Sequence, residues 1–149
     1  MTTADVAGRI ARLTGTSVRE VRLIGGQHLW RHHAVTLADG RQVFAKIFSE
    51  RSVAGLLHTE ARGLRWLASA DGGPAVPDVL GCDESALVLS WVPSGPATPE
   101  AAHRFGRELA ALHAAGAAGF GAPWPGFIAS LPLDNEPARP GGWPEWAIE

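Results

Sequence analysis

The sequence predicts an α+β fold, in which an antiparallel sheet packs against one helix and a second helix follows after a stiff linker. Stretches 17–24, 32–37 and 41–48 alternate apolar and polar residues, which is the two-residue period of a β-strand. Residues 52–70 and 98–115 instead repeat apolar side chains at the spacing of an amphipathic helix. The strands follow one another without an intervening helix, so antiparallel pairing is expected.

Length and composition describe a chain large enough for one domain with a real core. The 149 residues carry a formal net charge of −2 and no run of basic residues, which argues against a nucleic-acid partner. No stretch approaches the length of a membrane span, and residues 1–12 lack the apolar core of a signal peptide. The single cysteine, Cys82, excludes an internal disulfide and fits a reducing compartment, so a cytoplasmic location is expected.

The N-terminal part is predicted as one helix followed by three strands. The helix covers residues 3–14, with Thr3 as its cap and Gly15 as its end. A hairpin turn at residues 38–40 joins the second and third strands, and Gly40 supplies the positive φ angle that this turn needs. Sequential hairpins of this kind predict that the three strands are neighbours in the sheet.

Between the first two strands, the pair Gly25-Gly26 breaks the alternation. Without side chains, the backbone there can bring its amides close to a phosphate group. A plain turn is the commoner explanation of an isolated glycine pair. The next strand pair, however, leads directly to a half-buried lysine, which favours the functional interpretation.

That lysine, Lys46, is the only lysine in the chain, since the other twelve of the thirteen basic residues are arginines. It lies inside the apolar run Val43–Phe48, where strand alternation places it on one face with Phe44 and Phe48. An ammonium group on a half-buried strand needs an anionic partner, because desolvating an unpaired charge costs several kcal/mol. The alternative is a lysine on an edge strand whose ammonium reaches solvent.

The helix over residues 52–70 carries a candidate partner for this ammonium. Ser52 is its expected cap, and its apolar stripe consists of Leu56, Leu57, Leu64 and Leu67. Glu60 lies inside the helix and is either a solvated surface residue or the anion that pairs with Lys46. A strand lysine paired with a helix glutamate, downstream of a glycine turn, is the ion pair that orients a lysine onto nucleotide phosphates.

The chain is then expected to divide into two lobes. A short strand at residues 76–81 precedes the apolar run Ala86–Val92, which should be buried on both faces in the middle of the sheet. A proline-rich linker follows, which gives a small lobe over residues 1–92, a linker over 93–97 and the start of a large lobe over 98–149. A strand that ends in a linker leaves backbone donors and acceptors that suit the edge of an adenine ring.

Beyond the linker, the helix over residues 98–115 is predicted with Thr98 as its cap and a proline in its first turn. His113 lies near its C-terminus, where a histidine is common because it interacts favourably with the helix dipole. Residues 120–132 are irregular but aromatic, so they should pack against another part of the chain. The last residues, 143–149, are typical of the start of a helix.

Several short segments carry the most specific pattern in the sequence. Those in the first part of the chain are Gly25-Gly26, Leu37–Lys46, His58–Leu64 and Leu87–Val92. Those in the second part are Leu109–His113, Phe120-Gly121, Phe127–Pro132 and Trp143–Trp146. In order and spacing they resemble the fructosamine kinase family, an aminoglycoside-phosphotransferase-like branch of the protein-kinase-like fold. The lysine–glutamate pair alone indicates only a kinase-like fold, whereas the Phe-Ile-x-Ser-x-Pro and Trp-Pro-Glu-Trp segments point to the fructosamine branch.

The resemblance implies a protein-kinase-like small lobe, made of an antiparallel sheet and a packed helix, followed by the first helix of the large lobe. It also implies transfer of the γ-phosphate of ATP, with Mg²⁺, to a sugar hydroxyl of a ketosamine, such as fructosyl-lysine on a glycated protein. In the family this phosphorylation destabilises the adduct and so repairs glycation.

The same resemblance assigns roles to individual residues. Lys46 would hold the nucleotide phosphates, and Glu60 would orient Lys46. Gly25 and Gly26 would form the turn on the phosphate side, and Phe44 would wall the adenine pocket. The backbone expected to bind adenine belongs to Ser90, Trp91 and Val92.

The chain departs from the family pattern in several places. Gln27–Trp30 follows the glycine pair where the family has small polar residues, Ser90 replaces an acidic residue, and Pro125-Gly126 replaces Asp-Asn. More importantly, the 149 residues contain neither the His-Gly-Asp loop that would supply the general base nor the aspartate that would follow it. We therefore expect the general base and the Mg²⁺ ligands beyond Glu149, with no catalytic residue and no metal site in this chain.

Two alternatives stay open. In the first alternative, the phosphate acceptor is another small molecule used in the same branch, such as an aminoglycoside, choline or homoserine. The Trp-Pro-Glu-Trp segment disfavours this alternative. Otherwise the chain is a truncated, non-catalytic nucleotide lobe that serves as a binding module, with the missing C-terminal half as its partner. In that second case the helix over residues 98–115 would expose an apolar face.

Overall fold

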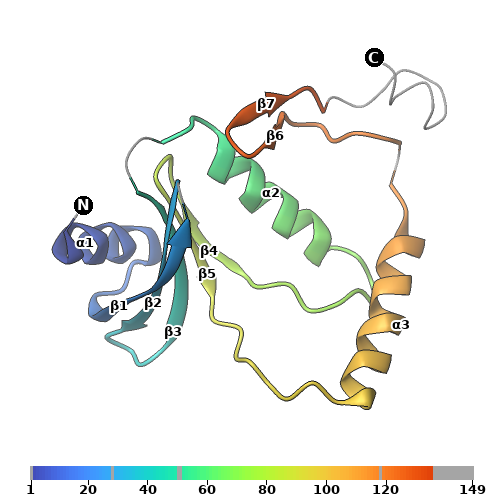
Figure 1. The fold of residues 1–149 in the computed structure, drawn as a ribbon, viewed down its shortest axis with the longest axis horizontal. Coiled ribbons are helices and arrows are strands. Elements are labelled where there is room, and N and C mark those ends of the chain that lie inside the picture. The colour runs from blue at the N-terminus through green and yellow to red at the C-terminus, as the bar shows by residue number, and fades with distance from the viewer. Residues whose placement is uncertain (1, 28, 50–51, 118, 136–149) are drawn as a thin grey trace.

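The structure is a computed structural model that describes residues 2–27, 29–49, 52–117 and 119–135. Its elements in chain order are α1 (Thr3–Thr14), β1 (Val18–Gln27), β2 (Trp30–Leu37), β3 (Gln42–Phe48), α2 (Leu56–Ala68), β4 (Val79–Cys82), β5 (Ala86–Ser90), α3 (Pro99–Ala115), β6 (Gly126–Ile128) and β7 (Leu131–Leu133). Figure 1 shows α1 and the larger sheet at one end of the molecule, α3 at the other, and α2 between them.

Five strands form one sheet in the order β1-β2-β3-β5-β4, and β6 pairs with β7 in a separate hairpin. Every neighbouring pair is antiparallel, so the predicted α+β class is confirmed. The predicted hairpin turn at residues 38–40 is also confirmed, with a φ of 87° at Gly40. Because β3 lies between β2 and β5, both of its edges are hydrogen-bonded.

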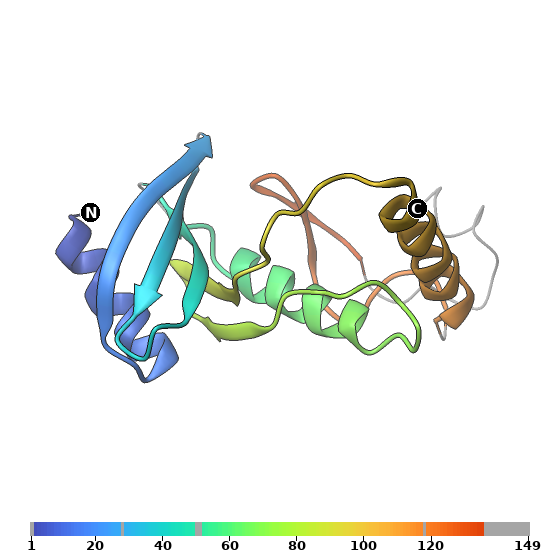
Figure 2. The same ribbon diagram turned by 90° about the horizontal axis from the view of Figure 1, so that it is seen from below.

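Helices cover both faces of the larger sheet, and each face has its own apolar cluster. On one face, α1 packs Val6 and Ile10 against inward-facing residues of β2, β3 and β5. On the other face, α2 packs Leu57 and Ala61 against Phe48 and residues of β5. Figures 1 and 2 both show the sheet lying between α1 and α2. The sheet is therefore the middle layer of this part of the chain.

Strand β5 is buried on both faces, as predicted. Its first four residues are all buried, and they alternate between the two clusters: Ala86, Leu87, Val88 and Leu89. The strand ends at Ser90, two residues earlier than predicted, and residues 91–98 connect it to α3 without regular structure. The division of the chain into two lobes at residues 93–97 stays a prediction.

The start of α3 agrees with the sequence, and the start of α1 differs by one residue. Thr98 caps α3, since its hydroxyl oxygen accepts a hydrogen bond from the backbone N–H of Ala101. The prediction of Thr3 as the cap of α1 is wrong, because Thr3 is already helical. Thr2 is the cap, and it forms a capping box with Asp5 in which each side chain bonds the backbone N–H of the other residue.

The helix predicted from Ser52 begins later, so the prediction of Ser52 as its cap is wrong. Gly55 precedes the first residue of α2 with a left-handed φ of 79°, and it offers no side-chain cap. Its backbone N–H instead donates to the Glu84 carboxylate at 3.0 Å. Of the predicted apolar stripe, Leu56 and Leu57 are buried, whereas Leu67 is 39% exposed. The sheet therefore holds mainly the N-terminal half of α2.

The glycine pair does not interrupt the first strand, so that prediction is wrong. β1 continues through both glycines, with Gly25 opposite His32 and Gly26 opposite Arg31. Gly26 has a φ of 150°, and a Cβ atom there would lie 2.3 Å from the carbonyl oxygen of Trp30. Position 26 therefore requires glycine because the backbone of β2 passes so close. At Gly25 the space around a Cβ is open to 4 Å.

The chain after α3 is more regular than predicted. Residues 120–132 were expected to be irregular, but they include β6 and the start of β7, because Phe127 and its neighbours pair across a tight turn. As predicted, this segment packs on another part of the chain, since Phe127 contacts the α2 cluster. Within α3 no residue is buried, and Phe105 is 53% exposed. The helix predicted at residues 143–149 lies outside the described residues.

His33 is a buried titratable group on β2, on the same face as Val35. Its Nδ1 atom has no hydrogen-bond partner among the residues that the structure describes. Burial lowers the pKa of His33 from its ordinary value, and the nearby charges of His32 and Arg31 lower it further. The folded protein therefore favours a neutral imidazole at this position.

This burial predicts a stability that depends on pH. Below the ordinary pKa of 6.5, the unfolded chain binds more protons at His33 than the folded chain does. The free energy of unfolding should therefore fall as the pH drops below 6.5, and His33→Leu should remove this part of the loss. Urea unfolding between about pH 5 and pH 8 measures it. His103→Gln, on the exposed surface of α3, is the matched control. Identical pH profiles for His33→Leu and the parent chain would contradict the prediction.

Candidate active site

The predicted ion pair between Lys46 and Glu60 is present. The Lys46 Nζ atom lies 2.6 Å from Glu60 Oε2, and the two side chains are 18% and 33% exposed. Lys46 occupies the middle of β3, opposite His32 on β2 and Leu87 on β5. This interior position excludes the alternative of a lysine on an edge strand. The ammonium is held on the face of the sheet that α2 covers.

Helix periodicity explains why Glu60 reaches this ammonium. Leu57 and Ala61 are four residues apart on α2, and both are buried against the sheet. Glu60 follows Leu57 by three residues and immediately precedes Ala61, so it lies at the border of the buried face. From that border its carboxylate reaches Lys46 while its own side chain stays partly solvated.

The sequence-based interpretation missed Trp30, which covers another side of the ammonium. Lys46 Nζ lies 4.1 Å from the centroid of the Trp30 ring, within the range of a cation–π interaction. The same ring packs on Phe48, with 4.3 Å between centroids and an angle of 31° between planes. Strand alternation is the signal that could have revealed this residue, because Trp30 lies two positions before His32, the cross-strand neighbour of Lys46.

An aromatic surface lies beside the ion pair. Phe44, predicted as a wall of the adenine pocket, is half-buried on β3 opposite Leu89 of β5. Its ring centroid lies 5.4 Å from that of His32, with 45° between the planes. A planar ligand could stack against such a surface next to Lys46. The role of Phe44 stays a prediction.

The three residues predicted to bind adenine lie where β5 enters the connection to α3. The Ser90 N–H donates to the carbonyl of Asp78 at 2.9 Å, so this amide is already used inside the fold. The Ser90 hydroxyl accepts from the Asp78 N–H at 2.8 Å. Among the hydrogen bonds that the described residues form outside regular helices and strands, none involves the backbone of Trp91 or Val92. Adenine binding by these residues stays a prediction.

The glycine pair lies on a strand that is not adjacent to the strand of Lys46. Gly25 and Gly26 belong to β1, and β2 separates them from β3. Gly25 shares a cross-strand line with His32 and Lys46. The sequence prediction that the pair forms a turn is thus corrected, while its role toward phosphate stays a prediction.

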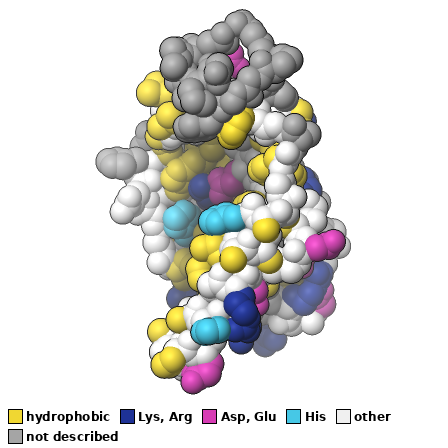
Figure 3. Space-filling model, turned by 90° about the vertical axis from the view of Figure 1, so that its right-hand side faces the viewer, with side chains coloured by type: hydrophobic (Ala, Val, Ile, Leu, Met, Phe, Trp, Pro, Cys, Tyr) yellow, Lys and Arg dark blue, Asp and Glu magenta, His cyan; other side chains and the backbone are white. Residues whose placement is uncertain are grey.

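Figure 3 shows a hollow on one face of the molecule, where a basic and an acidic side chain lie between hydrophobic ones and close to histidines.

Other reactive groups are scarce in the described part of the chain. Burial raises the pKa of Cys82 to about 11, so this thiol stays protonated and a poor nucleophile at neutral pH. The described residues include no group of three or more His, Cys, Asp or Glu side chains that could hold a metal ion. They also form no helix of the length and apolarity needed to cross a membrane.

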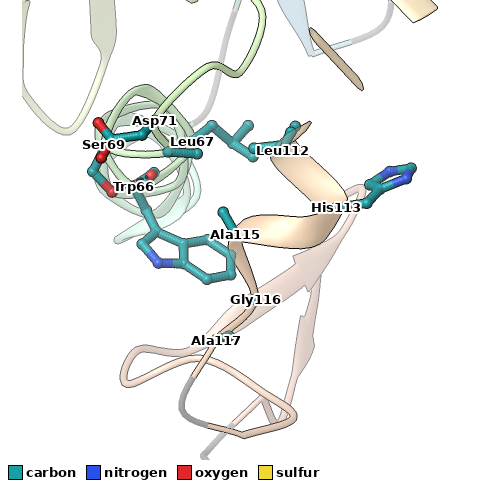
Figure 4. A pocket seen from close by; sticks show the side chains of 10 residues that line it. Trp66, Leu67, Ser69, Asp71, Leu112, His113, Ala115, Gly116 and Ala117 are labelled. Carbon is teal, nitrogen blue, oxygen red and sulfur yellow. Dashed lines mark hydrogen bonds between the residues drawn. The ribbon is translucent and has the colours of Figure 1, made fainter. Parts of the chain in front are cut away.

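A separate cavity of about 620 Å³ lies at the C-terminal ends of α2 and α3. Figure 4 shows Trp66 and Leu67 on the side of α2, with Leu112 and Ala115 on the side of α3. None of the residues lining this cavity belongs to the Lys46–Glu60 site. Glu60 and Trp66 are six residues apart on α2, more than one and a half helical turns. The cavity and the ion pair are therefore distinct features.

A five-stranded antiparallel sheet, a lysine on its interior strand and a glutamate from the helix packed on it define the small lobe of a protein-kinase-like fold. The family model of fructosamine kinase matches residues 3–145. The chain belongs to the fructosamine kinase family, which makes it part of a family of phosphotransferases. The resemblance inferred from the sequence is confirmed.

Two solved structures are similar to the chain, and both are described as putative fructosamine-3-kinases. The one from Thermobifida fusca YX-ER1 is similar over 99% of the chain, with a TM-score of 0.89 and 45% sequence identity. The one from Haemophilus somnus 129PT is similar over 89% of the chain, with a TM-score of 0.74; at 20% identity it shows the shared fold alone. The chain spans about half the length of these structures, 51% and 46% respectively. No curated protein matches the sequence.

The ion pair predicts a measurable cost of neutralising Glu60. Glu60→Gln keeps the shape of the side chain but leaves the Lys46 ammonium, 18% exposed, without its countercharge. The free energy of unfolding should fall by about 1–2 kcal/mol, measured by urea unfolding. Glu108→Gln is the matched control, because Glu108 pairs with Arg104 on the surface of α3 at 3.6 Å. That control should cost less than about 0.5 kcal/mol. Equal losses in the two variants would contradict a special contribution of Glu60.

Proposed function

We propose that this chain is the nucleotide-binding part of a kinase that transfers the γ-phosphate of ATP to a sugar hydroxyl of a ketosamine. The observation that carries the proposal is the Lys46–Glu60 ion pair on the interior strand of a kinase-like lobe. Membership of the fructosamine kinase family supplies the class of reaction. The acceptor, a fructosamine such as fructosyl-lysine on a glycated protein, is proposed from the family and from the 45% identity to the Thermobifida fusca protein.

In this proposal Lys46 binds phosphate oxygens of the nucleotide. An ammonium group has three N–H donors, and Glu60 accepts one of them. The Trp30 ring lies 4.1 Å from the ammonium on a second side, and the third N–H would donate to a phosphate oxygen. The carboxylate orients the lysine, and the indole keeps water from one side of it.

The rest of the nucleotide would lie along the same face of the sheet. Phe44 would wall the adenine ring, and the backbone of Trp91 and Val92 would bind its edge. Gly25 would allow the phosphates to approach β1, because the space beside its Cα is open. Gly26 contributes by letting β2 pass close to β1.

Mg²⁺ would neutralise charge on the nucleotide phosphates in such a reaction. The described residues offer no cluster of carboxylates for it, and the sequence has no His-Gly-Asp loop. We therefore propose that the Mg²⁺ ligands and the general base belong to a part of the protein outside this chain. That part would correspond to the half of the Thermobifida fusca structure that this chain does not cover.

Phosphorylation of a ketosamine destabilises the adduct, so the proposed cellular role is the repair of glycated amines. We place this role in the cytoplasm, which the free Cys82 supports. The second candidate is a non-catalytic binding module. It is favoured by α3, which buries no residue and exposes 53% of Phe105, so that an apolar surface is available to a partner.

Nucleotide binding can be tested at a single side chain, because Lys46 is the only lysine in the sequence. We expect an amine-reactive adenosine analogue, 5′-fluorosulfonylbenzoyladenosine, to modify Lys46, and excess ATP to slow the modification. Peptide mass spectrometry measures both. The matched control is Lys46→Arg, which keeps the charge and should show no label on that peptide. Modification of Lys46 at the same rate with and without ATP would refute nucleotide binding at this site.

The absence of the catalytic loop from the sequence predicts that this chain alone transfers no phosphate. Incubated with Mg-ATP and fructosyl-lysine, the purified chain should release no ADP above the rate of a Lys46→Met variant. Fructosyl-lysine phosphate, detected by mass spectrometry, would show that the general base lies within these residues after all. Phosphorylation of an aminoglycoside, choline or homoserine by the purified chain would also place the general base within these residues, and it would favour that acceptor over the ketosamine.

A further inference from the structure

Residues 122–135, which we call the α2 strap, fold back onto the helix that carries Glu60. The strap is closed by its own backbone: the Ala122 N–H donates to the Asn135 carbonyl at 2.6 Å, and β6 pairs with β7. Figure 1 shows this hairpin beside α2, although α3 lies between the two in the sequence. The strap thus joins the end of the described chain to its middle.

Three contacts fix the strap to α2. Phe127 packs into the apolar cluster at the start of the helix. The Thr59 hydroxyl donates to the carbonyl of Pro125 at 3.1 Å. Trp124 packs edge-on against Trp66, with 6.1 Å between ring centroids and 80° between planes. The contacts are therefore spread over the length of α2 instead of meeting at one point.

Two of these contacts, those of Thr59 and Trp66, involve a side of α2 that the sheet does not hold. Thr59 and Trp66 are seven residues apart, close to two helical turns, so they share one stripe of the helix. The stripe facing the sheet contains Leu57 and Ala61 instead. Residues 65–68 of α2 are all exposed, and the first turn has no side-chain cap. The sheet alone therefore fixes only part of the helix.

We propose that the α2 strap positions Glu60 by fixing the rotation of α2 about its axis. Thr59 and Glu60 are consecutive, so their directions differ by about 100° in a rigid helix. A rotation that removes the Glu60 carboxylate from Lys46 also pulls Thr59 away from the Pro125 carbonyl and Trp66 away from Trp124. The strap residues act on Lys46 through Glu60, and they do so whatever ligand Lys46 binds. They are positioning residues.

The sole lysine makes a direct test feasible. The 149-residue protein is produced with lysine labelled with ¹⁵N at the ζ-nitrogen, so NMR at low temperature records a single side-chain ammonium. The rate at which this ammonium exchanges hydrogen with water reports on its bond to Glu60. Thr59→Val removes the hydroxyl at nearly constant size, and Trp124→Ala removes the ring. Each should raise the exchange rate of the Lys46 ammonium about fivefold. Glu60→Gln sets the rate expected for complete loss of the ion pair.

Two matched controls change other residues of the hairpin, and a third makes a milder change at Thr59. Ile128→Ala and Leu131→Ala change residues that are 63% and 69% exposed, and Thr59→Ser keeps the hydroxyl. All three should exchange at the rate of the parent chain. Slow backbone amide exchange in β3 should persist in every variant, which shows that the sheet is intact. Where Trp124→Ala does not fold, the comparison of Thr59→Val with Thr59→Ser decides.

Two results would overturn the proposal. One is a parent-like ammonium exchange rate in Thr59→Val and Trp124→Ala while Glu60→Gln exchanges fast. The other is equal acceleration in Ile128→Ala and Leu131→Ala, which would mean that any change in the hairpin loosens the fold. This experiment contains no nucleotide, so its failure is distinct from a failure of ATP to protect Lys46 from the adenosine reagent.

Discussion

The geometry of the candidate site depends on one ammonium group, which lies on an interior strand of the sheet. With a side chain only 18% exposed, Lys46 cannot be solvated as a surface lysine is, and an unpaired charge there would destabilise the fold. Glu60 supplies the opposite charge, and Trp30 covers a further side with the face of its ring. The three side chains come from β3, α2 and β2, so a single charge connects two strands to the helix that packs on them.

Stability is not the main benefit of this pair, because desolvation offsets most of the Coulomb attraction between partly buried charges. The apolar clusters on the two faces of the sheet supply the folding free energy, through residues such as Ile10, Ile47 and Leu57. What the pair contributes is geometry: a cation with a fixed direction beside an aromatic surface formed by Phe44 and His32. A ligand that carries several negative charges next to a planar ring matches this combination, as nucleotides do.

Local sequence patterns and simple electrostatics were sufficient to predict much of this fold. The alternation around Lys46 and the need for a countercharge predicted Glu60 correctly, and Thr98 was identified as a cap from its own neighbours. The wrong predictions concern places where residues distant in the sequence determine the local structure. β1 continues through Gly25-Gly26 because β2 provides pairing partners there, and α2 starts after Gly55 instead of Ser52 because Glu84 binds that backbone. Likewise, no local signal pairs β6 with β7, or places their hairpin on α2.

The path of the chain gives the strap a consequence for the order of folding. Lys46 and Glu60 are 14 residues apart, so the entropic cost of closing the loop between them is small, and they can meet as soon as β3 and α2 exist. The hydrogen bond between Thr59 and Pro125 closes a loop of 66 residues that contains β4, β5 and α3. During synthesis from the N-terminus, the sheet and its ion pair can therefore form on a helix whose orientation is completed only later. A nascent chain that has not yet reached Trp124 has all the charged groups of the site, but it lacks the restraint that holds them in register.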